Sequence, residues 1–323
     1  MASTSNSEPV AHDDGDNASL SSTGTDYTSL RSSVLDYEYE NGRRYQSYRK
    51  GEYVFPNDDD EQDRMDFLHH IYNMILGGEL YVAPVGDTAR RVLDIGTGTG
   101  IWAIDFADEH PAAEVIGNDL SPIQPKWVPS NCIFEVDDFE SNWEYNRPFD
   151  YIHGRELVGS IKDINRLAKQ AFDNLNPGGY FELQAFTLNV FSDDNSLEER
   201  GPFTIQMCEL IKEAGEKFGK PMQDIEETWS KAFELAGFIK VTPKMVKVPF
   251  SPWSNDPKQK KIGQFMQSQQ SQALPSYLPG LLTTILGWSK EEVTVLTAKV
   301  RKELYDLSVH QYGKVYFIYG QRP

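Results

Sequence analysis

The chain has 323 residues, of which 39% are hydrophobic, so it is long enough to form one large domain with a substantial core. Its 49 acidic and 31 basic side chains give a formal charge of −18, and a surface of that charge repels phosphate backbones, which argues against general binding of DNA or RNA. No apolar run is long enough to span a bilayer and no secretory leader is visible, so we expect no membrane contact and a location in the cytosol, the nucleus or both.

The N-terminal part of the sequence is polar and then basic and aromatic. Residues 1–35 are rich in Ser, Thr, Asp, Asn and Gly. Such a composition cannot bury enough surface to offset the entropy of ordering, so this tail is predicted to be disordered. Residues 36–90 are predicted to form an N-terminal lid and helical segment, in which residues 37–53 interleave tyrosines with arginines such as Arg43 and Arg49. These tyrosines either pack on the acidic core or close over a ligand site, and the sequence leaves both interpretations open.

A first helix is predicted from Asp58 to Leu76, because acidic residues precede apolar residues at helical spacing and Gly77 follows. His69 and His70 lie on this helix, where adjacent side chains point to different faces. They therefore make a poor metal-binding pair, and we expect one to be packed and the other solvated. The two cysteines lack metal-ligand spacing as well, so no metal site is predicted.

Short apolar strands then alternate with helices. The predicted strands are Arg91–Ile95, Val115–Gly117, Cys132–Val136, Phe149–His153 and Tyr180–Phe186, with helices at Ile101–Glu109 and Ile164–Leu175. This alternation is typical of a doubly wound α/β fold, in which a mostly parallel sheet is covered by helices on both faces.

The C-terminal part interrupts this rhythm with a long insertion. After the fifth strand the sequence predicts a polar loop, two helical stretches, the second at Asp224–Ala236, and a strand at Val241–Phe250. Residues 251–313 then form a mostly helical insertion before a final strand, Lys314–Gly320. Residues 91–323 are accordingly predicted to be one domain with the insertion as a cap.

The turn after the first strand of the alternation carries three glycines, Gly96, Gly98 and Gly100, with Thr97 between the first two. Glycines at a strand–helix turn let the backbone reverse sharply and let a ligand approach without meeting a Cβ. The spacing is G-x-G-x-G rather than the G-x-G-x-x-G of dinucleotide-binding folds. Asp94 lies two positions before the first glycine, where a carboxylate would repel a pyrophosphate but suits a sulfonium ligand that carries an amino group.

Two further acids follow the next two strands. Asp119 comes 19 positions after Gly100, where this kind of fold places a carboxylate that accepts hydrogen bonds from ribose hydroxyls. Asp138 follows the third strand and can accept from an adenine amino group, while Leu120 and Phe139 can enclose the ring. Each acid alone is also compatible with a helix cap, a turn or a solvated pair. Three acids in order at successive strand ends favour S-adenosylmethionine as the ligand.

At these residues the sequence resembles the class I S-adenosylmethionine-dependent methyltransferases, and more closely a fungal, LaeA-like group tied to secondary metabolism. The resemblance covers roughly residues 50–323 and is most specific at Leu120–Pro125. The matching phrases are Phe55–Asp58, Val92–Trp102, Gly117–Pro125, Asp150–His153, Asn176–Gly179, Leu286–Trp288 and Tyr319–Pro323.

The resemblance implies a seven-stranded sheet whose last strand is antiparallel, with S-adenosylmethionine as cofactor. It carries cofactor-binding roles to Asp94, Gly96, Gly98, Gly100, Asp119, Leu120, Asp138 and Phe139, and we add Thr97 as part of the same turn. Asn118 departs from the family, which more often has an apolar residue at that position.

Methyl transfer is an in-line displacement from an activated sulfonium, so the protein's main task is to hold donor and acceptor together and exclude water. A base is needed only for a hydroxyl or a protonated amine. His153, at the end of the fourth strand, is the catalytic candidate, and a hydrogen-bonded structural histidine is the competing interpretation. Arg155 could orient an anionic acceptor or pair with Glu156, and His310 is a weaker second candidate for the base.

The insertion is predicted to cover the methyl acceptor. Its apolar side chains suit an aromatic or polyketide-like small molecule, or simply pack over the sheet. They are Trp253, Phe265, Met266, Tyr277, Leu281, Leu282 and Trp288. The sequence thus predicts an enzyme that methylates a small secondary metabolite. The alternatives are a regulatory methyltransferase that acts through protein partners, a module that binds the donor without transfer, and a nicotinamide dehydrogenase, which the glycine spacing disfavours.

Overall fold

The computed structural model describes residues 37–40, 42–46, 48–49, 55–222 and 225–323. The predicted tail therefore lies outside the described residues, as does part of the basic and aromatic segment that follows it.

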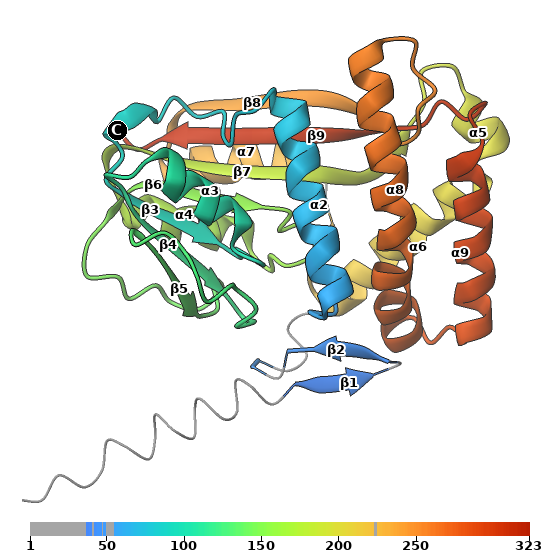
Figure 1. Cartoon of the computed structure of the whole chain (residues 1–323), viewed down its shortest axis with the longest axis horizontal. Helices are drawn as coiled ribbons and strands as arrows, with labels where there is room; N and C mark the ends of the chain where they lie inside the picture. Colours follow the sequence, from blue (N-terminus) through green and yellow to red (C-terminus); the bar gives the residue numbers. More distant parts are fainter. Residues whose placement is uncertain (1–36, 41, 47, 50–54, 223–224) are drawn as a thin grey trace, which may run out of the picture.

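A seven-stranded sheet forms the centre of the molecule, in the order β5-β4-β3-β6-β7-β9-β8 (Figure 1). The strands are β3 (Arg91–Ile95), β4 (Glu114–Asp119), β5 (Cys132–Val136), β6 (Phe149–Arg155), β7 (Leu175–Phe191), β8 (Ile239–Pro249) and β9 (Tyr312–Gln321). Strands β3 to β7 pair in parallel, whereas β9 is antiparallel to both β7 and β8. The predicted doubly wound α/β fold with an antiparallel last strand is confirmed.

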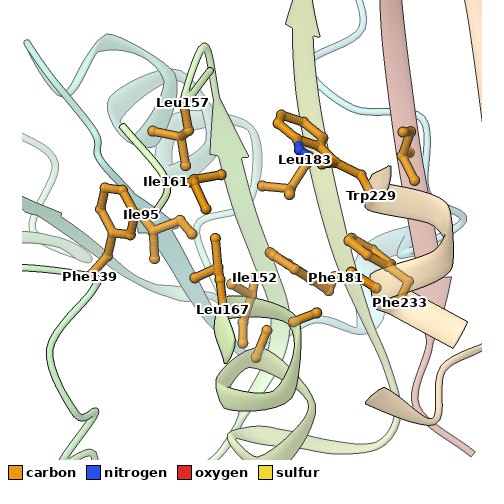
Figure 2. Packing of buried hydrophobic residues seen from close by; sticks show 14 of the residues in the cluster. Ile95, Phe139, Ile152, Leu157, Ile161, Leu167, Phe181, Leu183, Trp229 and Phe233 are labelled. Carbon is orange, nitrogen blue, oxygen red and sulfur yellow. The ribbon is translucent and has the colours of Figure 1, made fainter. Parts of the chain in front are cut away.

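Alternate residues of the central strands supply two separate cores, because successive side chains of a strand point to opposite faces. On one face, Leu93, Ile95 and Ile152 pack against α4 (Ile164–Asp173) and α7 (Ile225–Ala236) (Figure 2). On the other face, residues such as Val92, Val115 and Tyr151 pack against α3 (Ile101–Glu109). Both faces of the central sheet are thus covered, which explains why its strands are almost continuously apolar.

The first long helix, α2 (Asp59–Leu76), ends at the predicted residue and begins one residue after the predicted start, because Asp58 is its N-cap. The side chain of Asp58 accepts a hydrogen bond from the backbone of Glu61, and Gly77 ends the helix with φ +78°. As the sequence predicts, His69 is buried and His70 is exposed. A two-stranded hairpin, β1 (Glu38–Glu40) and β2 (Arg43–Tyr45), precedes the helix, and Arg43 pairs with Asp58 at 2.5 Å. A short 3-10 turn, η1 (Gly86–Thr88), leads from α2 to β3.

Strand β7 is longer than the sequence predicts at both ends. It begins at Leu175, so α4 ends at Asp173 and the predicted helix stop lies within the strand. It also runs past the expected polar loop to Phe191, because β9 supplies antiparallel partners for Val190 and Phe191 after a bulge. Strand β6 likewise continues to Arg155, since Gly154 and Arg155 pair with β7. His153 therefore lies inside its strand rather than at the end.

Helices occupy both long connections around β8. Between β7 and β8 lie α5 (Ser196–Arg200), α6 (Pro202–Phe218) and α7. The predicted cap insertion contains α8 (Pro257–Pro279), a π-helical turn η2 (Gly280–Ile285) and α9 (Lys290–Tyr305). Helix α8 packs between α2 and α9 (Figure 1). Among the helices that the structure describes, none is long and apolar enough to cross a bilayer.

Candidate functional site

A cavity of about 310 Å³ lies at the carboxyl ends of β3, β4 and β6, beneath α2 and α8. The strand order reverses at this place, since β4 and β6 flank β3, and ligands of open α/β sheets bind at such a reversal. The predicted site residues on its wall are Asp94, Gly96, Thr97, Gly98, Asp119, Leu120, Asp138, Phe139 and His153. The structure thus brings together residues that are far apart in the sequence. Of the residues predicted to bind the cofactor, Gly100 is the one that does not line the cavity.

The glycines of the turn have different structural tasks. Gly96, Gly98 and Gly100 all have positive φ, at +60°, +59° and +82°. A Cβ at Gly100 would lie 2.3 Å from the ring of Phe134, so this glycine lets the turn pack on β5 rather than face the cavity. A Cβ at Gly98 would instead point toward Met65 of α2, at 3.2 Å, in the space between the turn and the helix.

Asp94 is buried and bonded on both sides. Thr97 donates its hydroxyl to one carboxylate oxygen at 2.5 Å, and His153 Nδ1 lies 2.7 Å from the other. The ring of His153 is fully buried and stacks on Trp102 at 3.7 Å. Its Nε2 has no hydrogen-bond partner among the described residues. The imidazole therefore fixes Asp94, and its other nitrogen is buried without a partner among the described residues.

Asp119 accepts the backbone N–H groups of Gly98 at 2.8 Å and of Ser121 at 2.9 Å. Burial nevertheless raises the pKa of this carboxyl to about 6. Gln124, in the sequence run most specific to the resembling group, donates to the carbonyl of Gly98 at 2.7 Å. These bonds tie the end of β4 to the glycine turn and fix the position of the carboxylate at the cavity wall.

Asn118, the departure from the resembling family, also supports the turn. Its side-chain oxygen accepts the N–H of Gly96 at 3.2 Å, and its amide donates to the hydroxyl of Tyr145 at 3.2 Å. An apolar residue could make neither bond, so in this chain the amide takes part in holding the first glycine.

Asp138 and Phe139 form the far end of the cavity. Asp138 accepts the N–H of Glu140 at 2.9 Å, and Arg49 from the N-terminal segment lies 3.9 Å from its carboxylate. Phe139 is nearly buried, and a Cβ at Gly96 would lie 3.6 Å from its ring. Arg49, a residue of the predicted lid, thus lies beside Asp138, the acid that is expected to bind the adenine.

Helix α2 contributes residues that the sequence analysis did not assign to the site. Thr99 of the turn donates to Asp66 of α2 at 2.6 Å, which joins the helix to the cofactor loop. Arg64, Met65 and His69 of the same helix line the cavity. The polar side chains among the apolar residues of α2 could have indicated a functional role in the sequence. They do not show which other element of the fold they contact.

Charged residues gather where β6 leaves the sheet. Glu156 has a left-handed backbone, φ +57°, and accepts hydrogen bonds from the Tyr72 hydroxyl and from the N–H of Phe186. Burial raises the pKa of this carboxyl. Strained non-glycine residues of this kind are concentrated at functional sites. The pairing considered for Arg155 and Glu156 does not form, because Arg155 bonds to His69 Nδ1 at 2.8 Å instead.

The other half of the cavity is mostly apolar, with Gln269, Gln270 and Lys220 as polar residues on its wall. Its wall comes from β7, α6, α8 and η2, with Phe186, Leu188, Met207, Ile211, Met266, Ala273, Leu274, Tyr277, Leu278 and Leu281. Three of the predicted cap residues, Met266, Tyr277 and Leu281, lie on it. Trp253, Phe265, Leu282 and Trp288 are not on this wall. Trp253 packs against His310 and Phe265 against Phe67 of α2, while Leu282 and Trp288 pack in an apolar cluster with side chains of α6, α8 and α9. His310 is also absent from it and bonds to Asp194 at 2.7 Å.

These features fit S-adenosylmethionine. Gly98, Asp119 and Asp138 line one cavity, as the sequence analysis expects of residues that bind this donor. Within the described ranges, no group of three His, Cys, Asp or Glu side chains is arranged to hold a metal ion.

Comparison with known proteins agrees with this geometry. A family model described as a methyltransferase domain matches residues 67–242. Methyltransferase pytC of Aspergillus terreus is 43% identical over 302 residues, which are 93% of each chain. The chain belongs to the S-adenosylmethionine-dependent methyltransferases.

Two other relatives of this methyltransferase are named for different roles. The probable methyltransferase tdiE of Emericella nidulans is 33% identical and covers 82% of this chain and 83% of its own. The secondary metabolism regulator laeA of Aspergillus fumigatus is 32% identical and covers 88% of this chain and 76% of its own. The resemblance to the LaeA-like group is confirmed, and the relatives include both a named regulator and named methyltransferases.

Proposed function

We propose that this methyltransferase acts on a small, largely apolar molecule of secondary metabolism. The observation that carries the proposal is the continuity of the cavity, which joins the glycine turn to the apolar wall under α8 and η2. A donor at the turn and an acceptor against that wall would share one enclosed space. Such an arrangement brings the reactants together and excludes water, which is the main requirement of methyl transfer.

We propose the following cofactor contacts. Asp94, Gly96, Thr97 and Gly98 surround the part of the donor that carries the sulfonium, while Gly100 shapes the turn. Asp119 accepts from the ribose, and Leu120, Asp138 and Phe139 hold the adenine. Support comes from their common cavity and, for Asp119, from a carboxylate that already accepts two backbone donors from the loop and the strand end.

A proton acceptor is needed if the methyl goes to a hydroxyl group. His153 stays a prediction for this role, supported by its unpaired Nε2 and by Asp94, which holds the other nitrogen. Glu156 is a second candidate, because it lines the cavity beside the apolar half. Replacing each in turn, His153→Gln and Glu156→Gln, distinguishes them: the base is the residue whose loss lowers transfer while the affinity for S-adenosylhomocysteine stays unchanged.

The proposal is tested by obstructing the apolar half. Ala273 on α8 is buried and lines the cavity, so Ala273→Phe fills space that the acceptor needs and leaves the glycine turn intact. We expect an affinity for S-adenosylhomocysteine within threefold of wild type and at least a tenfold loss of labelled methyl transfer to small molecules of a fungal metabolite extract. Ala298→Phe, on an exposed position of α9, is the matched control and should transfer normally. Label that enters only protein would contradict a small-molecule acceptor.

A regulatory methyltransferase acting through protein partners is the second candidate, and the likeness to laeA favours it. It predicts that a partner co-purifies with the full chain from its native host and that label from the donor enters that partner. Recovery of the chain from the cytosol, the nucleus or both would fit either function, so the labelled product decides between them.

A further inference from the structure

Arg155 is placed at the cofactor loop by the register of the sheet. Ile95 pairs with Gly154, so the next residue of β6, Arg155, lies beside the first glycine of the turn. Asp119 ends β4 on the opposite flank of β3. The arginine and the ribose-binding acid thus stand on the two sides of the same loop, and Arg155 lines the cavity.

Three cations lie on the cavity wall, and two of them have an acidic partner. Arg64 bonds to Glu61 at 2.7 Å, and Lys220 lies 3.9 Å from Glu140. Among the described residues, Arg155 makes no ion pair within 4 Å, although the chain carries an excess of 18 negative charges. A guanidinium without a carboxylate partner at a cavity wall is suited to an anion of the ligand.

The orientation of this guanidinium is fixed by α2. Arg155 donates to His69 Nδ1 at 2.8 Å, and His69 Nε2 lies 2.8 Å from Asp105. A neutral imidazole satisfies both contacts, with Nδ1 accepting and Nε2–H donating, and burial lowers the pKa of His69, which favours the neutral form. The guanidinium also lies over the ring of Tyr72 at 4.9 Å. These contacts fix the orientation of the Arg155 guanidinium and of its remaining N–H groups.

We propose that Arg155 binds the α-carboxylate of the methionine portion of the donor, with His69 as the residue that positions it. The donor carries one carboxylate. The contacts proposed above use Asp119 for the ribose and Asp138 for the adenine, and they give this carboxylate no partner. Its placement across the end of β3 would put the ribose toward β4 and the amino-acid end toward β6, where Arg155 lies.

The test compares two ligands that differ in the amino-acid portion. S-adenosylhomocysteine contains the carboxylate, whereas 5′-methylthioadenosine lacks the whole amino-acid end. By calorimetry, Arg155→Gln should weaken S-adenosylhomocysteine about 10- to 100-fold, the range for lost charged hydrogen bonds, and change 5′-methylthioadenosine less than threefold. His69→Leu should give a smaller loss that is also confined to S-adenosylhomocysteine.

Arg147→Gln removes an exposed arginine far from the cavity and should affect neither ligand. Equal weakening of both ligands by Arg155→Gln would show that the arginine only supports the fold, and the proposal would be wrong. Unchanged affinity for S-adenosylhomocysteine together with lower methyl transfer would assign Arg155 to an anionic acceptor and would also overturn it. The two affinity measurements use donor analogues only, so they are independent of which acceptor the enzyme methylates.

Discussion

Asp119 shows how one side chain can serve both the loop and a ligand. Its carboxylate accepts the N–H of Gly98, and this bond orients it for the ribose contact proposed above. Its burial makes ionisation costly, and the pKa of about 6 lies above the usual range for aspartate. If Asp119 binds the ribose as proposed, donor binding depends on a group that is close to protonation at mildly acidic pH.

This predicts a pH dependence of cofactor affinity. Only the ionised carboxylate of Asp119 can accept from both ribose hydroxyls, so affinity should be constant above about pH 7 and fall about tenfold for each further pH unit below the pKa of the free protein. Calorimetry with 5′-methylthioadenosine from pH 5 to 8 measures it. Asp119→Ala should bind about 10- to 100-fold more weakly at neutral pH and lose the dependence. The same slope in wild type and variant would place the titrating group elsewhere.

Sequence reasoning could place residues that are marked by local patterns. The glycine turn and Asp94 are recognisable because they lie within a few positions of one another, and Asp119 because it ends the next strand. Arg155 and His69 could be found separately, but their hydrogen bond joins β6 to α2, and no local pattern records it. The role of Asn118 was also hidden, because its effect depends on the Gly96 N–H and on Tyr145 together.

At the scale of elements, the apolar wall of the cavity depends on a contact between helices α6 and α9. Glu303 of α9 is buried and accepts the N–H groups of Phe203 at 3.0 Å and Thr204 at 2.7 Å, in the first turn of α6. A carboxylate there satisfies free N–H groups and suits the positive end of the helix dipole. One side chain of the cap thereby anchors a helix that precedes β8.

Glu303→Gln should therefore lower the free energy of unfolding by about 1–3 kcal/mol, because the charge is lost and one backbone N–H faces the side-chain NH2, which cannot accept a hydrogen bond. Urea unfolding followed by circular dichroism measures the change. Glu216→Gln, on an exposed position of α6, should stay within about 0.5 kcal/mol of wild type. A shift in the control as large as that of Glu303→Gln would mean that general charge balance, and not the contact, is responsible.

The bounds of the helices and strands were predicted better than the tertiary contacts between them. Helix α3 and strands β3 and β5 have the predicted bounds, and α2 differs by one residue at its start, since caps and apolar runs mark these elements. Strand β7 was underestimated because its last residues are ordered by pairing with β9, more than a hundred residues later. The acceptor wall from α6 was missed because Met207 and Ile211 are indistinguishable in sequence from ordinary core positions.

At the scale of the whole molecule, the cavity lies between the sheet and helices that arrive from both ends of the chain. A ligand that fills it contacts α2, the sheet and α8 together, and it can bind only the folded chain. S-adenosylhomocysteine at 100 times its dissociation constant should therefore stabilise the protein by about 2.7 kcal/mol. The shift of the urea midpoint measures this effect. NAD at the same concentration should give no shift, and a shift equal to that of S-adenosylhomocysteine would contradict the cofactor assignment.

The position of β9 has a consequence for biosynthesis. Although it is the last strand to leave the ribosome, it lies between β7 and β8 and is antiparallel to both. Until it is translated, two unpaired strand edges face each other across a gap, and the cap helices that precede it have no finished sheet to rest on. A nascent chain that ends before Tyr312 therefore has an incomplete sheet with exposed apolar edges. Premature termination within the codons for β9 should accordingly yield an aggregation-prone product that chaperones retain, rather than a slightly shortened enzyme.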